Sequence, residues 1–315
     1  MNTSQPPARP RPPADRAVAA LDIGGTKIAA GLVAPDGTLL HHRELPTPRT
    51  TGDLRDPGLA GTAEAARTIL ADAARLGLTV TGLGAGFPEY VDADGRLTSR
   101  EVLDWDTQPA ALLTAHTPPG LPVAVDSDVR CGALGEARHG AGRHLPDFLY
   151  ISLGTGLSST LVINGRPLTG RRGEAIALGE LEVPASVDPH WHGTLEQYCS
   201  GRGIAQRHTT ATGTPTPGAR EVSHLAHSGD HTAAHILTTA GQALGTVLAH
   251  LVRLLDPTAI VLGGGLGTTS GPLHTALHTA YTHTTRSRPN PPPIHPPTLG
   301  PRAPLIGAAT LTASW

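Results

Sequence analysis

The apolar residues near the start of the chain form short runs, separated by turn residues, of the length typical of strands. Residues 17–45 (AVAALDIGGTKIAAGLVAPDGTLLHHREL) divide into three strand-like segments, broken by Gly24–Gly25 and by a turn at Asp36–Gly37. Connections this short predict an antiparallel meander. A helical pattern over residues 61–76 and a further strand over residues 80–87 follow. This order predicts a sheet that receives a crossover helix.

The same order of elements returns in the second half of the chain. Residues 121–128 (LPVAVDSD) predict a short strand that ends in acids, and a helix begins at Asp128. Residues 147–168 predict two strands around Gly154-Thr155-Gly156, with a hairpin turn at Asn164–Gly165. Two α/β halves, each opening with a hairpin and carrying a glycine turn, predict a duplicated fold with a nucleotide held between them.

The remaining pattern is mainly helical. Residues 194–208 predict one helix, and a loop rich in Gly, Pro and Thr follows it. Residues 233–255 predict a long apolar helix that ends at Asp256–Pro257, and a strand over residues 259–265 comes directly afterwards.

Length sets the domain organisation that we expect. A chain of 315 residues exceeds what one hydrophobic core usually organises, so two lobes are expected. Residues 1–16 are rich in Pro and Arg and predict a disordered tail. We predict a first lobe at residues 17–126, completed by a C-terminal helix at about 304–315, and a second lobe at residues 127–303.

Composition excludes several classes of partner. The formal net charge of -2 gives no basic field that would concentrate nucleic acid. Cys131 and Cys199 form no CxxC pair, which argues against a disulfide scaffold and suits a reducing compartment. No apolar run approaches the roughly 20 residues that span a bilayer, and no signal peptide opens the chain. We therefore expect a soluble, cytoplasmic protein without a membrane partner.

The first glycine turn joins a carboxylate to residues that suit a phosphate. Asp22 ends an apolar strand, and Gly24, Gly25, Thr26 and Lys27 follow. Glycines let backbone N–H groups approach a phosphate, and Thr26 adds a hydroxyl. Asp22 could then face Mg²⁺ through water. An ordinary tight hairpin, with a solvated Lys27, explains the same residues.

Two further glycine stretches fit a nucleotide. Gly154, Thr155 and Gly156 lie at the turn of the second half that matches the first glycine turn. Gly263-Gly264-Gly265 closes a strand after the long helix and leaves room for an adenine or ribose. Neither a full GxGxxG fingerprint nor a Walker A lysine motif is present in the sequence.

Asp128 is the candidate catalytic base. It stands between a strand and a helix, and phosphoryl transfer to an alcohol needs a carboxylate that accepts the hydroxyl proton. The alternative is that Asp128 only caps the helix, which Asp commonly does.

The motifs together resemble one family. LDIGGTKIAAGLV, PVAVDSDVRCGALGEARHGAGR, YISLGTGLSSTLVINGRPLTG, GTLEQYCSGRGI, IVLGGGL and PLIGAAT occur in the order and spacing typical of the ROK family of sugar kinases. The resemblance implies an α/β fold of the duplicated actin-like (ribonuclease H-like) type with two domains and a cleft between them. It also implies MgATP at the first two glycine turns, adenosine near residues 263–265, and Asp128 as the base.

The same resemblance implies the reaction and the assembly. Such kinases typically phosphorylate the primary 6-hydroxyl of a hexose or amino hexose, and they often form homodimers. Family members that act as repressors carry an N-terminal helix-turn-helix, for which residues 1–16 are too short. A sugar sensor without chemistry remains an alternative to the kinase, although a sensor needs no base.

The sugar site departs from the family pattern. Ser127 stands where an Asn usually contacts a sugar hydroxyl, and Ala177 and Glu180 stand where a Glu and a His bind sugar. The sugar-contacting Glu of the family is kept as Glu196. In the second glycine turn, Ser158 and its neighbours replace further glycines.

The zinc cluster of the family is also changed. Val187, Pro189 and Thr194 replace its three cysteines, so structural zinc of that type is not expected. His190 and His192 could bind a metal with Glu180, or they could be solvated loop residues.

Acidic residues at altered positions suggest the substrate. Glu89, Glu101 and Glu180 would favour a cationic group if two of them face it. This leads to an amino hexose such as kanosamine, or an aminocyclitol, in secondary metabolism such as antibiotic biosynthesis. If Glu89 and Glu101 are solvated loop residues instead, a neutral C7-cyclitol stays possible.

Overall fold

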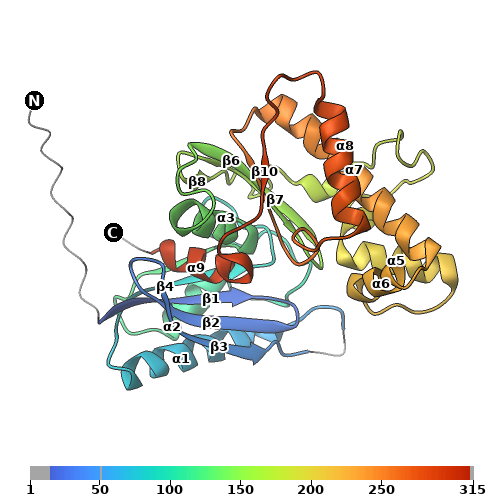
Figure 1. Cartoon of the computed structure of the whole chain (residues 1–315). Helices are drawn as coiled ribbons and strands as arrows, with labels where there is room; N and C mark the ends of the chain where they lie inside the picture. Colours follow the sequence, from blue (N-terminus) through green and yellow to red (C-terminus); the bar gives the residue numbers. More distant parts are fainter. Residues whose placement is uncertain (1–14, 50–51, 313–315) are drawn as a thin grey trace, which may run out of the picture.

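The computed structural model of the protein describes residues 15–49 and 52–312, and Figure 1 shows two lobes built on two five-stranded sheets. Residues 1–14 of the predicted tail and residues 313–315 of the predicted C-terminal helix lie outside the described ranges. Arg16 already belongs to the first strand, one residue before the predicted start. In the described ranges no helix combines the length and apolarity needed to cross a membrane.

The first sheet has the strand order β3-β2-β1-β4-β5. The predicted meander is present: β1 (Arg16–Ile23) pairs antiparallel with β2 (Lys27–Val33), which pairs antiparallel with β3 (Leu39–Pro46). On its other side β1 pairs parallel with β4 (Thr79–Phe87), which pairs parallel with β5 (Val123–Ser127). The chain therefore needs crossover connections between β3, β4 and β5.

Helices cover both faces of the first sheet. The predicted crossover helix is α1 (Ala60–Arg75), preceded by the short η1 (Pro57–Leu59), and its buried face packs with Leu21 and Ile23 of β1. The alternate residues Val18 and Ala20 of β1 face the opposite side and pack against α9 (Ala303–Thr310). A short helix, α2 (Pro109–Ala115), lies between β4 and β5 in the chain. Alternation along one buried strand thus fills two separate cores.

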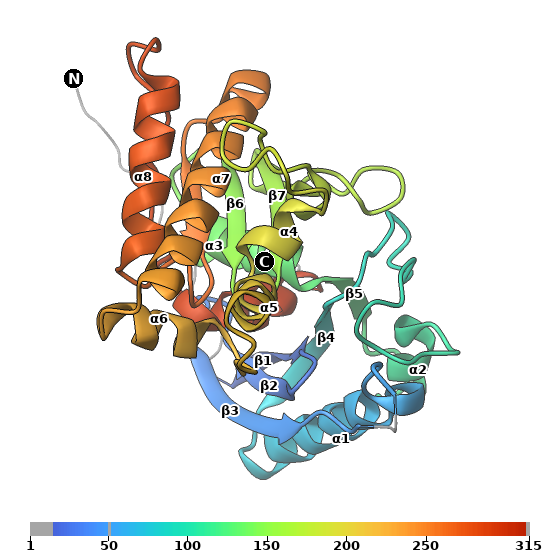
Figure 2. The same cartoon turned by 90° about the vertical axis from the view of Figure 1, so that its right-hand side faces the viewer.

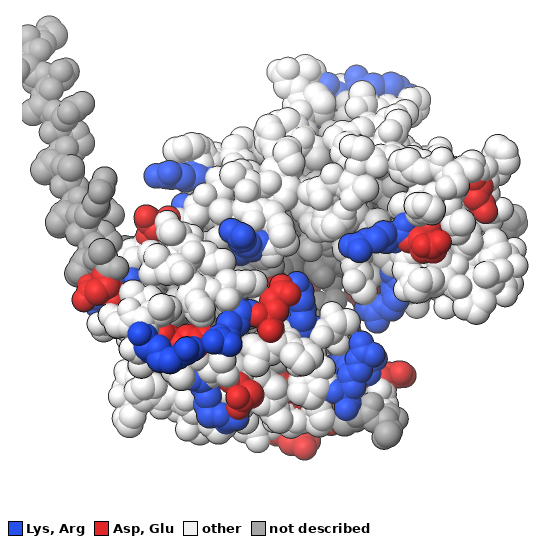
Figure 3. All heavy atoms as spheres, turned by 60° about the horizontal axis from the view of Figure 1, so that its bottom comes forward, with Lys and Arg blue, Asp and Glu red and all other residues white. Residues whose placement is uncertain are grey.

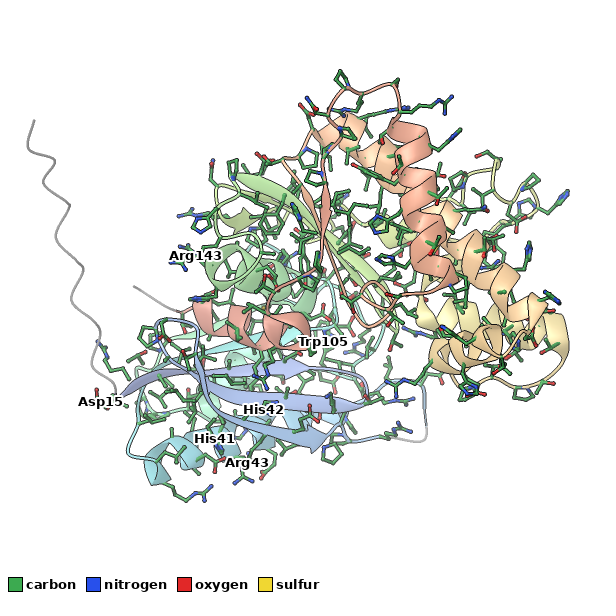
Figure 4. The ribbon with its side chains drawn as sticks, viewed as in Figure 1. Asp15, His41, His42, Arg43, Trp105 and Arg143 are labelled. Atoms are coloured by element: carbon green, nitrogen blue, oxygen red, sulfur yellow. The ribbon has the colours of Figure 1, made fainter. Side chains whose placement is uncertain are left out.

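The edge strand β3 is tied to α1 by a buried carboxylate. Asp72 of α1 is 2% exposed and accepts hydrogen bonds from Nε2 of His41 (2.8 Å), from Arg43 and from Arg75. Figure 4 labels His41, His42 and Arg43, which follow one another along β3. A buried carboxylate needs such partners, so this cluster holds the sheet edge in place.

The second sheet has the order β10-β9-β6-β7-β8. A hairpin of β6 (Asp147–Leu153) and β7 (Leu157–Ile163) repeats the β1–β2 arrangement, and β8 (Arg166–Pro167) follows the predicted turn. On the other side β9 (Ile260–Gly263) pairs parallel with β6, and β10 (Ile294–His295) pairs parallel with β9. The Asn164–Gly165 turn has positive φ at both residues, which suits a tight hairpin.

The helices of the second lobe are bounded as follows: η2 (Leu178–Glu180), α4 (Leu195–Cys199), α5 (Gly201–Thr212), α6 (Ala219–His227), α7 (His231–Leu255), α8 (Pro272–Thr285) and η3 (Gly300–Arg302). The helix predicted over residues 194–208 is two helices. Ser200 separates them because its side chain accepts a hydrogen bond from the amide of Gly203 and caps α5. The helices α2, α6 and α8 were not predicted.

The helix α3 (Asp128–His139) belongs to both lobes. Its Cys131 packs with α9 and β1, whereas Ala133 and Ala137 pack against Phe148 and Tyr150 of β6. The crossing with α9 is so close that a Cβ at Gly307 would lie 1.7 Å from the carbonyl oxygen of Cys131. The first residues of α3 are therefore held firmly where the two lobes meet.

Candidate active site

A cleft of about 570 Å³ separates the two lobes and is lined by residues from both. Figure 2 shows the lobes from the side, with α4 and α5 above β1–β3, and Figure 3 shows the surface hollowed between them. Most of the site residues predicted from the sequence line this cleft: Asp22, Gly24, Gly25, Thr26, Lys27, Glu89, Ser127, Asp128, Gly154, Thr155, Gly156, Glu180 and Glu196. Gly263, Gly264 and Gly265 are not among its lining residues.

Asp128 is the first residue of α3, and its half-buried side chain lines the cleft. The helix is capped by Ser127, whose hydroxyl accepts a hydrogen bond from the amide of Arg130 at 3.4 Å. The N-cap is therefore Ser127, and the carboxylate of Asp128 accepts a hydrogen bond from the amide of Val129 at 2.6 Å. Burial first, and the negative charge of Asp22 second, raise the pKa of Asp128 to about 7. A carboxyl group with this pKa suits a general base near neutral pH.

Asp22 stands near the end of β1, in the same sheet whose strand β5 leads into Asp128. Burial raises its pKa to about 6, although the positive charge of Lys27 acts in the other direction. Within residues 15–49 and 52–312 its carboxylate has no hydrogen-bond donor. A half-buried carboxylate without a partner, next to a second carboxylate, is a group that a cation would stabilise. The residues present therefore fit Mg²⁺, with Asp22 as the residue that would hold it.

The first glycine turn is tight and leaves amides unused. The amide of Gly24 donates to the carbonyl of Lys27 at 3.0 Å, and a Cβ at Gly24 would lie 2.9 Å from that oxygen. In the described ranges the amides of Gly25 and Thr26 have no protein acceptor. Lys27 pairs with Glu44 at the rim and is 59% exposed. The turn is thus both an ordinary hairpin and a possible phosphate contact.

The second glycine turn is fastened by the helices behind it. The amides of Gly201 and Arg202 donate to the carbonyls of Gly154 (2.8 Å) and Thr155 (3.1 Å). Across the described part of the chain, the amides of Thr155 and Gly156 have no protein acceptor. They could therefore donate to a phosphate across the cleft from the first turn.

The third glycine stretch packs beside the second turn but is not among the residues that line the cleft. Gly264 has φ +80°, and a Cβ there would lie 2.2 Å from the carbonyl oxygen of Leu153. That same oxygen accepts from the amides of Leu266 and Gly267 (3.0 and 3.1 Å). Of the three glycines, Gly265 borders open space. The room predicted for a flat group therefore exists at Gly265 rather than along the whole stretch.

Four glutamates line the cleft, Glu89, Glu101, Glu180 and Glu196, and their charges act on one another. The pKa of Glu101 is raised by burial first, and then by the charges of Glu89, Glu180 and Glu196. Burial, followed by the charges of Glu101 and Glu180, raises the pKa of Tyr90 to about 12. Glu196 also accepts from the amide of Leu157 at 2.9 Å, so it is bound to the second glycine turn. Tyr90 and these glutamates line the same cleft.

Glu89 has a different role from its neighbours. It is 5% exposed, so the alternative of a solvated loop residue does not hold for it. Its carboxylate accepts hydrogen bonds from the hydroxyl of Ser99 (2.5 Å) and from the amides of Glu101, Val102 and Leu103 (2.8–2.9 Å). The carboxylate therefore supports the loop that carries Glu101.

The segment that replaces the family's zinc cluster is held by aromatic and polar contacts. His190 and His192 are exposed, and in the described part of the chain no three His, Cys, Asp or Glu side chains form a metal-binding group. Trp191 packs edge-on against Tyr198 with ring centroids 5.0 Å apart. The hydroxyl of Tyr198 donates to Asp188 at 3.2 Å.

Sequence reasoning missed several residues that line the cleft, including Arg49, Arg55, Tyr90, Arg130 and Arg202. One signal was available, because an arginine in the first turn of an otherwise buried helix must have internal partners. The partners themselves could not be read from the sequence.

The fold and this cleft define an actin-like, two-domain protein with paired glycine turns facing a carboxylate. A model of the ROK family matches residues 18–314, and the chain belongs to this family. The resemblance and the fold class predicted from the sequence are confirmed.

Known relatives agree over most of the chain. The chain is 32% identical to a glucokinase of Streptomyces coelicolor over 266 residues, which is 78% of this chain and 81% of that protein. A ROK hexokinase of Thermus thermophilus has a TM-score of 0.79 and 32% identity, covering 94% of this chain and 97% of that one. A ROK glucokinase of Streptomyces griseus, solved with glucose and AMPPNP, has a TM-score of 0.76 and 29% identity, covering 94% and 98%.

Proposed function

We propose that the protein is an ATP-dependent carbohydrate kinase in which Asp128 is the catalytic base. The observation that carries this proposal is the position of Asp128, which lines the same cleft as both glycine turns and has a pKa raised to about 7. Family membership and the relatives named as glucokinase and hexokinase support the same reaction.

Asp128 accepts the proton of a sugar hydroxyl as the hydroxyl oxygen attacks the γ-phosphorus. The bond between the γ-phosphorus and the β–γ bridging oxygen breaks, ADP leaves, and the proton stays on Asp128 until solvent removes it. The free amides of Gly25, Thr26, Thr155 and Gly156 are placed to donate to the phosphates. Mg²⁺, held near Asp22, would neutralise phosphate charge. Adenosine binding beside Gly265 belongs to the same proposal.

For the substrate we propose a sugar or cyclitol with a primary hydroxyl, and within this class one that carries an ammonium group. Glu101, Glu180 and Glu196 bring negative charge to the lining of the cleft, with Glu196 next to the second glycine turn. An amino hexose such as kanosamine, used in secondary metabolism, fits this charge. A neutral hexose or C7-cyclitol is the alternative, and a homodimer is the assembly that we propose by analogy with the family.

The reaction is tested by following ADP release and sugar phosphate formation with hexoses, amino hexoses and cyclitols. Asp128→Asn should lower kcat by about 10²- to 10⁴-fold, because it removes the proton acceptor and keeps the side chain's size. Binding of the preferred sugar, measured by calorimetry, should be retained. A wild-type protein that binds a member of the panel but phosphorylates none would support a sensor instead.

A further inference from the structure

Arg130 is a buried cation in the first turn of the catalytic helix. It lies two residues after Asp128, and its side chain is 3% exposed. A buried guanidinium needs acceptors for its donors. It pairs with Asp126 (2.5 Å) and donates to the carbonyl oxygens of Val91 (2.5 Å) and Gly173 (3.0 Å).

The two carbonyl acceptors come from opposite lobes. Val91 follows β4, directly after Glu89 and Tyr90, whereas Gly173 lies in the segment between β8 and η2 that leads to Glu180. The two segments also touch each other. Gly173 has φ +84°, and a Cβ there would lie 2.1 Å from the carbonyl oxygen of Val91.

A second contact joins the same two walls. The hydroxyl of Thr98 donates to the carbonyl of Arg172 at 3.3 Å. This contact is exposed and neutral, whereas the arginine contacts are buried and charge-assisted, and such hydrogen bonds are roughly twice as strong as neutral ones. Arg130 is therefore the principal polar tie between the walls.

We infer that Arg130 is a positioning residue that fastens the sugar-side walls of both lobes, residues 88–91 and 170–176, to the helix turn bearing Asp128. The structural part of this inference stands by itself, and its catalytic consequence rests on the proposed kinase function. Both walls carry or support acidic residues of the cleft, because Glu89 holds the loop of Glu101 and the second wall leads to Glu180. Without Arg130 these groups would lose their fixed distance from the base.

The inference predicts different effects on the sugar and on ATP. None of the three acceptors of Arg130 belongs to a glycine turn, so its loss should change sugar handling and leave ATP handling unaltered. The positive charge of Arg130 also acts to lower the pKa of Asp128, so its removal should move the base to a higher pKa.

The test compares Arg130→Met and Arg130→Lys with the matched control Arg288→Met. Arg288 also donates to a carbonyl, that of Val252 (2.7 Å), and pairs with an aspartate, Asp256, but it does not line the cleft. Hydrogen–deuterium exchange is measured first. Residues 88–99 and 170–176 should exchange faster in Arg130→Met, and neither segment should change in Arg288→Met. If neither segment exchanges faster in Arg130→Met, Arg130 does not hold the two walls together. This result would overturn the structural part of the inference whether or not the protein is a kinase.

Steady-state kinetics then test the positioning role. In Arg130→Met we expect kcat/KM for the sugar to fall by about 10- to 100-fold, with the KM for ATP within about twofold of wild type. The ascending limb of kcat/KM against pH should move to higher pH. Arg130→Lys keeps the positive charge but loses the branched guanidinium with its several donors. We therefore expect the ascending limb to return to its wild-type pH, and kcat/KM for the sugar to recover only in part. Equal losses for sugar and ATP would overturn the positioning role.

Failure of the proposed function has a different signature. A wild-type protein that transfers no phosphoryl group would refute the kinase proposal, while the exchange measurement would still decide on the tie. If Arg130→Met does not fold, Arg130→Lys carries both measurements.

Discussion

At the scale of single residues, two of the glutamates in the cleft have different roles. Glu89 is buried and supports a loop, whereas the charge of Glu101 depends on its surroundings. The carboxylate of Glu89 accepts hydrogen bonds from backbone amides. Glu101 keeps contact with solvent at the cleft, and partial desolvation together with its acidic neighbours raises its pKa. A group that is held ionised against like charges gains when a cation arrives. For the cationic substrate that we propose, Glu101 rather than Glu89 is therefore the charge to test.

Glu101→Gln tests this charge without disturbing the loop, because the hydrogen bond to Glu89 uses the backbone amide of residue 101. We expect the KM for an amino hexose to rise by about 3- to 10-fold, and the KM for the matching neutral hexose to change less than about twofold. Initial rates with both sugars measure this. Glu182→Gln, exposed and outside the cleft lining, is the control. Equal changes for both sugars would contradict a role for charge.

The sequence was informative about which residues carry chemistry and less so about how they are held. Asp128 and the first two glycine turns were predicted from their motifs, and they do share one cleft. The support of Glu101 by Glu89 and the ties of Arg130 to Val91 and Gly173 were not predicted. These contacts join residues 12 to 43 positions apart, within the first lobe and between the lobes, so they depend on how the loops pack in the folded structure.

At the scale of elements, the three glycine stretches follow different physical rules. Gly24 is required by a tight hairpin, Gly264 by the backbone of Leu153 lying against it, and Gly265 by neither. A glycine that packs against backbone serves the fold, whereas one that borders open space can serve a ligand. The GGG sequence alone does not distinguish these cases.

The substitutions Gly264→Ala and Gly265→Ala separate the two roles. At Gly264 a positive φ and a 2.2 Å approach to backbone both oppose a Cβ, so we expect a loss of about 2–4 kcal/mol in the free energy of unfolding. At Gly265 we expect nearly unchanged stability and a KM for ATP raised by about 3- to 10-fold. Urea unfolding and initial rates provide the measurements. Wild-type stability of Gly264→Ala would contradict the packing argument.

Element boundaries show the same division between local and tertiary causes. The strands of both hairpins were predicted well because glycine marks their turns and short apolar runs flank them. The helix predicted over residues 194–208 was wrong in its continuity, since Ser200 ends α4 and caps α5. The helix α8 was missed because residues 272–285 are rich in Thr and His, and it is buried mainly through its packing on α7.

At the scale of the whole molecule, the lobes are less separate than the sequence suggests. The duplicated order of elements predicted two halves, but α3 packs on both sheets and α9 returns to the first sheet. Figure 1 shows these two helices between the sheets. The predicted boundary between residues 126 and 127 falls at the end of β5, just before α3. Because α3 packs on both sheets, the division of the chain into two domains at this point stays a proposal.

The two carboxylates at this junction make the stability of the whole molecule depend on pH. The pKa values of Asp22 and Asp128 are raised from 3.8 to about 6 and about 7, so the folded state binds protons more tightly than the unfolded chain. Their contribution to stability is therefore full at low pH and is lost as pH rises from about 4 to about 7. Binding of a cation at Asp22 would offset this loss.

Urea unfolding of the metal-free protein at pH 5 and pH 8 measures this contribution. Between these two pH values we expect the free energy of unfolding of wild type to fall, relative to Asp128→Asn, by about 1–4 kcal/mol, because the amide cannot ionise. Asp106→Asn removes an 89% exposed carboxylate and should follow wild type. If Asp128→Asn and wild type run parallel across this range, Asp128 is not held in the desolvated position that a base in this cleft requires.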